Sequence, residues 1–307
     1  MIDILLATYN GEKYLSEQIE SIINQTYKEW ILYIRDDGSK DNTINIVKRY
    51  VEMHPKKIKF IEDNKSSLGA KMNFAELIRY SKNDYCMFCD QDDFWLPNKI
   101  EITFLKMKEV EEIYGKKEPI LIHTDLKVVD ENLNTINNSF WEYMNLNYKK
   151  SSLNYMITQN MITGCTMMIN KSLVDVVEVI PSESYMHDWW IGLVASVFGK
   201  IDIVDEGTIL YRQHNNNEIG AKKERPINML INKMKSRTKV VIFESEIRQM
   251  KKFFDIYNEK LNNNYEKLIK EFISIRSKNA IERKSILIKN RIFHNDIIIN
   301  IKNIIFI

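Results

Sequence analysis

The chain has 307 residues, of which 44% are hydrophobic and 28% are charged. This composition is that of an ordinary globular protein, and it excludes the collagen-like, disordered and disulfide-scaffold classes. The net charge of +2 results from two opposite surpluses. Residues 1–221 carry 24 Lys and Arg against 33 Asp and Glu, whereas residues 222–307 carry 20 against 9. Such asymmetry favours two regions with different surroundings or partners, and we divide the chain at this point.

The N-terminus and the cysteines exclude further classes. The first residues lack the basic start and small-residue cleavage site of a signal peptide. No apolar stretch reaches the roughly 18–20 residues that span a bilayer. Cys86 and Cys89 form a CxxC within an apolar run typical of a strand, on which they would point to opposite faces. No second pair completes a zinc site, so we expect these residues and Cys165 to be reduced, buried and structural in a cytoplasmic protein.

The first hundred residues alternate between the patterns of strands and helices. Short apolar runs that predict buried strands occupy residues 2–8, 30–34, 58–61 and 85–89. Apolar residues at helical spacing predict helices over residues 11–25, from Asp41 or Asn42 to about residue 51, over 68–80, and from Pro97 to about residue 114. This rhythm predicts an α/β fold in which helices cover a parallel sheet.

The pattern of predicted strands and helices changes after about residue 119 and again at Pro226. Further strands are predicted over residues 120–124, 165–169 and 201–210, with helices near 171–179 and 189–198. From Pro226 onward the sequence is mostly helical in pattern, rich in lysine and poor in glycine. We therefore expect a basic helical C-terminal region, residues 222–307, appended to the α/β domain.

Polar clusters follow three of the predicted strands. Thr8-Tyr9-Asn10 comes after the first strand, Asp36-Asp37 after the second and Asp90-Gln91-Asp92-Asp93 after the fourth. In parallel sheets the ligand binds beyond the carboxyl ends of the strands. These three clusters are therefore expected to meet at one binding site.

The acidic cluster at residues 90–93 favours a metal site. Three carboxylates within four residues repel one another, and a hard divalent cation with oxygen ligands allows them to remain ionised. The alternative is a solvated acidic turn. An apolar strand before the cluster and Phe94-Trp95 after it favour a site for metal and phosphate.

The sequence contains neither of the common glycine-rich phosphate-binding motifs, GxxxxGK[ST] and GxGxxG. A nucleotide bound here would therefore be held by other residues. Asp36 or Asp37 can accept a hydrogen bond from the imide N–H of uracil or thymine. A base without this N–H would leave the buried carboxylate unpaired, so such a site would discriminate between bases. The alternative role is an Asp-Gly turn, and the segment can serve both.

Together these motifs resemble glycosyltransferase family 2, the inverting enzymes of the GT-A fold. The resemblance covers about residues 1–221 and is carried by Ala7-Thr8-Tyr9-Asn10-Gly11, Tyr14-Leu15, Ser21-Ile22, Gln25-Thr26-Tyr27, Asp36-Asp37-Gly38-Ser39, Asn42-Thr43, Asn73 and Asp90-Gln91-Asp92-Asp93. Two further segments resemble the rhamnosyltransferase-like subgroup: Asp90 to Lys99, and Tyr211-Arg212-Gln213-His214-Asn215 with Asn217.

The resemblance implies a set of residues that bind the nucleotide-sugar donor: Thr8, Tyr9, Asn10, Glu12, Asp36 or Asp37, Lys71, Asp90 and Gln91. Among them, Asp36 matches the family's base-reading aspartate and Lys71 would meet the diphosphate. Asp92 resembles the second acid of the DxD motif, a direct ligand of Mg²⁺ or Mn²⁺. His214 is either a further ligand of the metal or diphosphate or a structural histidine, and Arg212 can pair with phosphate.

The resemblance also implies a catalytic base and an acceptor site. Inverting transfer needs a carboxylate that takes the proton of the acceptor hydroxyl. Asp188 matches the family's acid at the start of a helix, where its alternative role is a helix cap. Trp189 and Trp190 would form a stacking wall for a sugar, and Gly164 would allow close approach of the acceptor. His187 stands where many members have Glu, which leaves its role open.

The C-terminal region has two interpretations. Its basic residues and helically spaced apolar residues (Met229, Leu230, Met234, Ile247, Met250, Phe253, Phe254, Ile256) suit amphipathic helices on anionic lipid. The alternative is packing on the catalytic domain or in a dimer. Nucleic-acid binding is not expected, because no recognised module accompanies the charge.

The sequence thus predicts an inverting, metal-dependent glycosyltransferase for bacterial surface polysaccharide. The expected donor is dTDP-L-rhamnose, with a UDP-hexose as alternative, and the expected acceptor is a lipid-linked saccharide at the cytoplasmic membrane face. Two other classes are a sugar nucleotidyltransferase and a non-catalytic saccharide-binding relative. The first needs a glycine-rich basic loop near the N-terminus, and the second would lack the acids at positions 90, 92 and 188.

Overall fold

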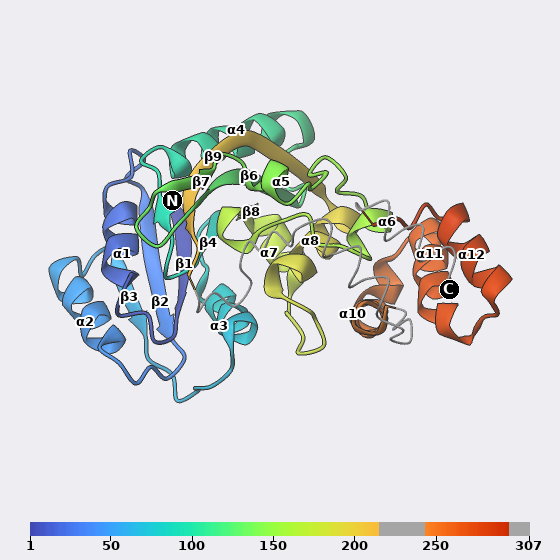
Figure 1. The fold of residues 1–307 in the computed structure, drawn as a ribbon, viewed down its shortest axis with the longest axis horizontal. Coiled ribbons are helices and arrows are strands. Elements are labelled where there is room, and N and C mark those ends of the chain that lie inside the picture. Colours follow the sequence, from blue (N-terminus) through green and yellow to red (C-terminus); the bar gives the residue numbers. More distant parts are fainter. Residues whose placement is uncertain (215–242, 295–307) are drawn as a thin grey trace.

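The computed structural model describes residues 1–214 and 243–294, whose strands form one mixed sheet. The strand order is β3-β2-β1-β4-β8-β6-β9-β5, with β7 paired to β6. Figure 1 shows the long, curved β6 and β9 arching over one side of the molecule. The strands are β1 (Ile2–Thr8), β2 (Trp30–Asp36), β3 (Ile58–Ile61), β4 (Tyr85–Cys89), β5 (Phe94–Trp95), β6 (Ile120–Val129), β7 (Thr135–Asn137), β8 (Met168–Asn170) and β9 (Lys200–Arg212).

The four strands predicted from the first hundred residues form the expected parallel unit. β1 pairs in parallel with β2 and β4, and β2 pairs in parallel with β3. The register places Thr8 opposite Asp36 and Leu6 opposite Cys89. The loops after β1, β2 and β4 therefore leave the sheet at one edge, as the pattern predicted.

The remaining strands differ in direction and length from the prediction. β8 runs antiparallel to both β4 and β6. It begins only at Met168, because Gly164–Thr166 form a 3₁₀ turn. β6 and β9 are longer than predicted, since they pair with each other in parallel as far as Val129 and Arg212. This pairing carries the end of β9 to the acidic loop after β4.

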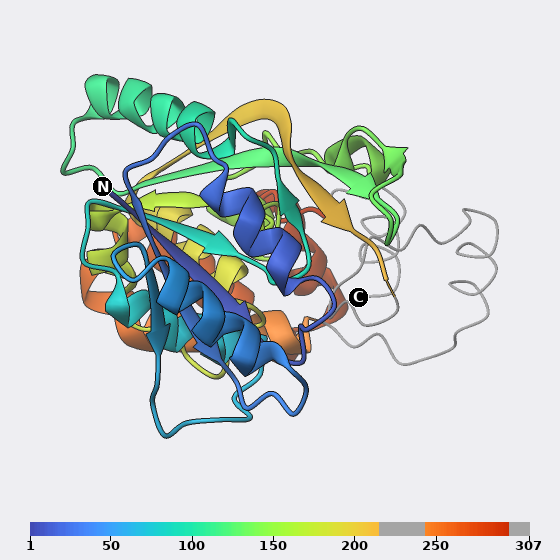
Figure 2. The same ribbon diagram turned by 90° about the vertical axis from the view of Figure 1, so that its left-hand side faces the viewer.

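Helices cover both faces of the sheet. The apolar sides of α1, α2 and α4 share one buried cluster with Ile4, Leu32 and Cys89, and Figure 2 shows α1 and α2 in front of the strands. α3, α7 and α8 share the opposite cluster with Leu5 and Cys86. The helices are α1 (Leu15–Ile23), α2 (Thr43–Met53), α3 (Ala70–Leu77), α4 (Lys99–Tyr114), α5 (Phe140–Tyr143), α6 (Leu153–Met156), α7 (Lys171–Val177), α8 (His187–Phe198), α10 (Glu244–Tyr257), α11 (Asn263–Ile273) and α12 (Ala280–Lys289).

The cysteines are structural, as predicted. All three are buried free thiols. Cys86 and Cys89 lie on opposite faces of β4, each within a different hydrophobic cluster. A disulfide between them is therefore excluded by the geometry of the strand.

The described part of the C-terminal region packs on the α/β domain. Phe253 is fully buried, with its ring centroid 5.6 Å from that of Trp190. The Tyr257 hydroxyl donates a hydrogen bond of 2.9 Å to the Val177 carbonyl. Packing, one of the two interpretations of this region, thus accounts for the apolar face of α10. Met229, Leu230, Met234 and the expected boundary at residues 221/222 lie outside the described residues.

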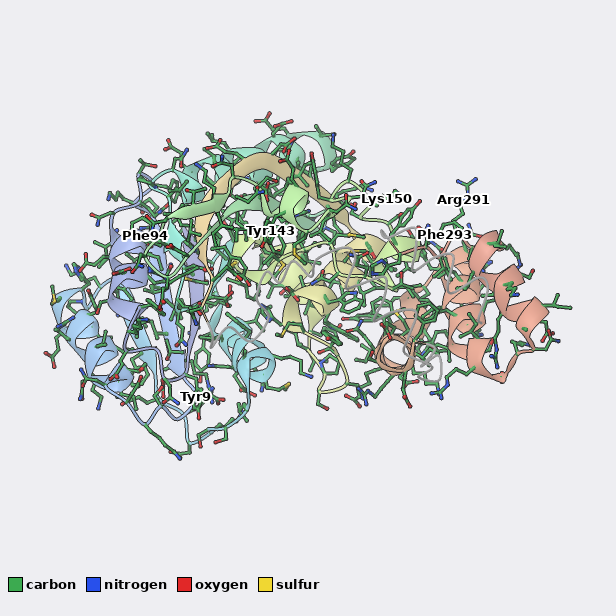
Figure 3. All side chains as sticks on the ribbon, in the orientation of Figure 1. Tyr9, Phe94, Tyr143, Lys150, Arg291 and Phe293 are labelled. Atoms are coloured by element: carbon green, nitrogen blue, oxygen red, sulfur yellow. The ribbon has the colours of Figure 1, made fainter. Side chains whose placement is uncertain are left out.

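The C-terminal helices extend the molecule away from the parallel strands. Arg291 and Phe293, labelled in Figure 3, lie at the end of the molecule opposite β1–β3. Among the helices of residues 1–214 and 243–294, none combines the length and apolar character needed to cross a bilayer.

Candidate active site

A cleft with a volume of about 870 Å³ opens beyond the carboxyl ends of β1, β2 and β4. Tyr9, at this edge of the sheet, is labelled in Figure 3. The predicted site residues that line the cleft are Thr8, Tyr9, Asp37, Asp90, Gln91, Asp92, Gly164, Asp188 and Trp189. Segments more than 150 residues apart in the sequence therefore meet in one cavity, as the strand-end clusters and the resemblance predicted.

Gln91 ties the loop after β1 to the acidic loop. Its side-chain amide donates to the Tyr9 carbonyl at 2.9 Å, and its Oε1 accepts from the Tyr9 N–H at 2.9 Å. Gly11 makes room for this arrangement, because a Cβ there would lie 2.3 Å from the Gln91 Oε1. The amide of Gln91 thus positions Tyr9, whose side chain remains half exposed at the cleft.

Asn10 and Glu12 lie elsewhere than predicted. The Asn10 Oδ1 accepts from the Lys40 N–H at 2.9 Å, and the Glu12 Oε2 accepts from the Asn42 N–H at 2.8 Å. Neither residue lines the cleft. Both side chains are directed to the loop between β2 and α2, where they accept hydrogen bonds from backbone N–H groups of that loop. Their role in this structure is to join two loops.

The two adjacent aspartates after β2 have different roles: one holds the turn, and the other faces the cleft. Asp36 holds the turn, since its carboxylate accepts from the Thr8 hydroxyl at 2.9 Å and from the Gly38 and Ser39 N–H groups at 2.9 and 2.7 Å. Asp37 is buried and lines the cleft. Its oxygens accept from the N–H groups of Leu68 and Gly69 at 2.9 and 2.8 Å. Asp37 is therefore better placed than Asp36 to meet a ligand.

Asp92 and His214, which the sequence indicated independently as candidate metal ligands, lie next to each other. The His214 Nε2 lies 2.8 Å from the Asp92 Oδ2. The imidazole also stacks on Tyr14, with ring centroids 5.0 Å apart. β9 brings His214 across 122 residues to this position, so this histidine is not isolated.

Arg212 fixes the acidic loop from behind. Its Nε donates to the Asp92 carbonyl at 2.9 Å, and its backbone N–H donates to the Asp93 Oδ1 at 3.2 Å. A terminal nitrogen forms an ion pair with Glu17 at 2.6 Å. The guanidinium is 3% exposed, so its expected pairing with phosphate is replaced by these protein contacts.

The donor set around Asp92 suits a hard or borderline divalent cation. Asp90 and Asp92 both line the cleft, and the His214 imidazole lies against the Asp92 carboxylate. Mg²⁺ and Mn²⁺ favour oxygen ligands, and imidazole is acceptable to Mn²⁺. The chemistry of Asp90, Asp92 and His214 suits the Mg²⁺ or Mn²⁺ that the resemblance implies. Within the described residues, the three possible ligand atoms that lie within 4.8 Å of one another belong to Asp90, Asp93 and Cys165.

Asp188 lies at the start of α8 with its carboxylate in the cleft. The Gly164 N–H donates to its Oδ2 at 2.9 Å, and the Trp189 N–H donates to its Oδ1 at 2.6 Å. Burial raises the pKa of Asp188 to about 7, and these N–H groups together with the Asn160 side chain limit the rise. A carboxylate with this pKa is suited to accept a proton near neutral pH.

His187 is a neutral, buried neighbour of Asp188. Its ring stacks on Phe74 with centroids 4.1 Å apart, and burial lowers its pKa to about 3. Neither ring nitrogen has a hydrogen-bond partner among residues 1–214 and 243–294. Gly164 is required beside it, because a Cβ at that position would lie 2.8 Å from the His187 Nε2. His187 thus fills space next to Asp188 without adding charge.

The two tryptophans after Asp188 have different surroundings. Trp189 lines the cleft, and its indole N–H donates to the Met156 carbonyl at 2.6 Å. Trp190 is fully buried against Phe253 and does not line the cleft. The predicted stacking wall therefore loses Trp190, whose ring packs against Phe253 and Tyr257 of α10 instead.

Lys71 also differs from its predicted place at the diphosphate. Its ammonium group donates to the carbonyls of Ser182 and Ser184, both at 2.7 Å. It is not among the residues that line the cleft. The lysine binds the segment before α8 instead.

Several lining residues were not among the predicted site residues. Asn73, already part of the family motif, is buried and donates to the Arg35 carbonyl at 3.2 Å. Much of the remaining lining is apolar and comes from Phe74, Phe140, Met144, Leu146, Met161 and Ile162. Such residues resemble ordinary core positions in a sequence, and only the fold shows that they border a cavity.

Comparison with known proteins assigns the chain to a family. Residues 3–177 match the family model for glycosyl transferase family 2. The chain belongs to this family of glycosyltransferases. It is 28% identical over 228 residues to a Shigella flexneri protein named dTDP-rhamnosyl transferase RfbG, covering 70% of this chain and 74% of that one.

A second relative has a different donor in its name. The Escherichia coli UDP-Glc:alpha-D-GlcNAc-diphosphoundecaprenol beta-1,3-glucosyltransferase WfgD is 28% identical over 178 residues, covering 57% of this chain and 62% of that one. Among solved structures, Staphylococcus aureus TarS 1–349 in complex with UDP superposes with a TM-score of 0.57 at 15% identity, covering 90% of this chain and 71% of that one. This likeness confirms the GT-A fold.

The contact between Gly164 and His187 can be tested by substitution. Gly164→Ala should lower the free energy of unfolding by about 1–3 kcal/mol, because the added methyl group overlaps the buried imidazole. The measurement is urea denaturation followed by circular dichroism. The double variant Gly164→Ala/His187→Ala removes the overlap and should lose less stability than the sum of the single variants. Additive losses would contradict the contact.

Proposed function

We propose that this glycosyltransferase is an inverting, metal-dependent enzyme that transfers L-rhamnose from dTDP-L-rhamnose to a saccharide acceptor in the synthesis of a bacterial surface polysaccharide. The donor would occupy the side of the cleft formed by Thr8, Tyr9 and Asp37. Asp90 would face the ribose and the metal, and Asp92 with His214 would hold the metal. Asp36, Asn10 and Glu12 would support the donor loops from behind.

The observation that carries this proposal is the placement of Asp188 in the same cleft as Asp90 and Asp92. An inverting transfer requires a proton acceptor on one side of the sugar and charge stabilisation at the leaving diphosphate on the other. Asp188 combines access to the cleft with a raised pKa of about 7. A non-catalytic saccharide-binding relative would not need a carboxylate at this position.

The proposed reaction is a single displacement. The acceptor hydroxyl gives its proton to Asp188 as its oxygen forms a bond to the anomeric carbon of the donor sugar. The bond between that carbon and the diphosphate oxygen breaks, and the electron pair leaves with the nucleoside diphosphate. When bound, Mg²⁺ or Mn²⁺ would neutralise negative charge on this leaving group. Trp189 would present an aromatic edge or face to the acceptor, and Gly164 would hold Asp188 through its N–H.

The identity of the donor is supported by the relatives rather than by a contact to the sugar. RfbG is named for dTDP-rhamnosyl transfer, and this favours dTDP-rhamnose. WfgD is named for a UDP-glucose donor and a diphosphoundecaprenol-linked acceptor, which keeps a UDP-hexose as the alternative and supports a lipid-linked acceptor. The nucleotidyltransferase class is not favoured, because the loop after β1 has no glycine-rich basic sequence for a triphosphate.

We also propose contact with the cytoplasmic face of the membrane through α12. Ile281 and Ile288 are 82% and 53% exposed and lie two turns apart on one side of this helix. Lys284 lies between them on the same side. Exposed apolar side chains beside a basic residue suit a surface of anionic lipid. The buried face of α10 has no part in this contact, since it packs on α8.

The role of Asp188 predicts the effect of one substitution. Asp188→Asn should lower kcat by about 10²–10⁴-fold, because the amide cannot take the acceptor proton. Affinity for the nucleotide-sugar should stay within about twofold by calorimetry, since only the base is removed. Asp175→Asn, a surface acid on α7, is the control. Loss of donor binding in Asp188→Asn would contradict the assignment.

The same residue fixes the pH dependence. With a pKa of about 7, Asp188 is protonated and inactive as a base below that pH. The rate of transfer should therefore rise from pH 5.5 to 8, with a midpoint at about pH 7.

A donor panel tests both the sugar and the metal. Thermal shifts with Mn²⁺ are measured for dTDP-rhamnose, UDP-glucose, UDP-galactose and UDP-N-acetylhexosamines, and the largest stabilisation is expected with dTDP-rhamnose. The shift should vanish in EDTA and decrease strongly in Asp92→Asn. A larger shift with UDP-glucose would favour the alternative donor, and an undiminished shift in EDTA would contradict metal dependence.

The membrane contact is tested by Ile281→Asp/Ile288→Asp. This double variant should lose most of its co-sedimentation with vesicles of phosphatidylglycerol and phosphatidylcholine, because both changes place a charge in the apolar contact. Ile113→Asp, which changes an exposed isoleucine on α4, is the matched control. Equal sedimentation of both variants would exclude α12 as the contact surface.

A further inference from the structure

The segment from Pro181 to Met186 leads directly to His187 and Asp188 and has no regular secondary structure. Tyr185 and Met186 line the cleft, and Tyr185 is 57% exposed. A segment of this kind is usually among the less stable parts of a protein. Its contacts therefore decide whether Asp188 and the acceptor side of the cleft are held in place.

Lys71 of α3 binds this segment from the parallel-sheet part of the molecule. Its ammonium group donates 2.7 Å hydrogen bonds to the carbonyls of Ser182 and Ser184. Two carbonyls converge on one cation only if the intervening backbone curves around it. The lysine thus fixes the curvature of the segment.

Gln249 of α10 binds the segment from the C-terminal region. Its side chain is fully buried, and its Oε1 accepts from the Tyr185 N–H at 2.8 Å. The helix that carries Gln249 is itself anchored by buried Met250 and Phe253. Lys252 on the same helix adds an ion pair to Glu183 at 3.6 Å, between partly exposed side chains.

We propose that Lys71 and Gln249 are positioning residues that clamp the segment Pro181–Met186 and thereby hold the acceptor side of the cleft against Asp188. This rests on the proposed role of Asp188 as the base. The two residues come from α3 and α10, which lie 178 positions apart. The C-terminal helices are accordingly part of the acceptor site, in addition to any contact they make with a membrane.

The clamp is tested first in the free full-length protein, by hydrogen–deuterium exchange. Gln249→Met removes the acceptor of the Tyr185 N–H at nearly constant volume, and Lys71→Met removes the donor to the two carbonyls. Each variant should speed exchange in peptides covering residues 181–188 by about tenfold or more, with little change in the sheet. Unchanged exchange in these peptides would overturn the proposal.

A matched variant separates the clamp from general destabilisation. Leu287→Ala removes a buried side chain of α12, a helix outside the clamp, that belongs to the same hydrophobic cluster. It should lower Tm without selective exchange at residues 181–188. Lys71→Arg retains a donor to the two carbonyls and should restore much of the protection. Selective exchange in Leu287→Ala equal to that in Gln249→Met would overturn the proposal.

Kinetics then tests the functional consequence. With GlcNAc-diphosphoundecaprenol as acceptor and the donor selected by the panel, Gln249→Met and Lys71→Met should lower kcat/KM for the acceptor about 10–100-fold, because the reacting groups are misplaced. The dissociation constant of the donor should not change. Faster exchange with an unchanged acceptor kcat/KM would overturn the positioning role. If Asp188→Asn remains active, the base assignment fails, whereas the exchange result still decides whether the clamp exists.

Discussion

The buried guanidinium of Arg212 is the contact on which the acidic loop depends. Asp90, Asp92 and Asp93 follow a buried strand, and their mutual repulsion would otherwise open the loop. The guanidinium Nε of Arg212 donates to the Asp92 carbonyl, its backbone N–H donates to the Asp93 carboxylate, and its charge pairs with Glu17. Burial, followed by the charges of Asp92 and Asp90, raises the pKa of Asp93 well above its usual range. Asp93 is fully buried, whereas Asp90 and Asp92 line the cleft.

The parts of the structure that the sequence predicted are those determined by local pattern. Apolar runs and helical spacing identified β1 to β4 and the helices between them, and strand-end clusters placed Asp90, Asp92 and Asp37 at one edge. Resemblance to the family then added Asp188, which periodicity alone would have left as a helix cap. The antiparallel β8 was not predicted, because strand direction depends on pairing between distant segments.

The direction of individual side chains was harder to predict from the sequence than the secondary structure. Lys71, Asn10 and Glu12 stand near the cleft in sequence, yet each finds backbone partners on a neighbouring loop. A motif fixes the position of a residue along the chain, whereas the nearest unsatisfied donor or acceptor fixes where its side chain points. In α10 the apolar face packs on α8, whereas the basic residues Arg248 and Lys251 of the same helix are exposed.

The replacement of Glu by His at position 187 bears on how Asp188 works. A second carboxylate at this position would add repulsion and raise the pKa of Asp188 further, and a charged imidazole would lower it. The buried ring is neutral, with its pKa lowered to about 3, so it does neither. The pKa of Asp188 is then set by its own burial and by N–H groups from Gly164 and Trp189. In the proposed reaction, the backbone around Asp188 would therefore control its basicity, and the proposed clamp on the segment preceding α8 would hold that backbone in place.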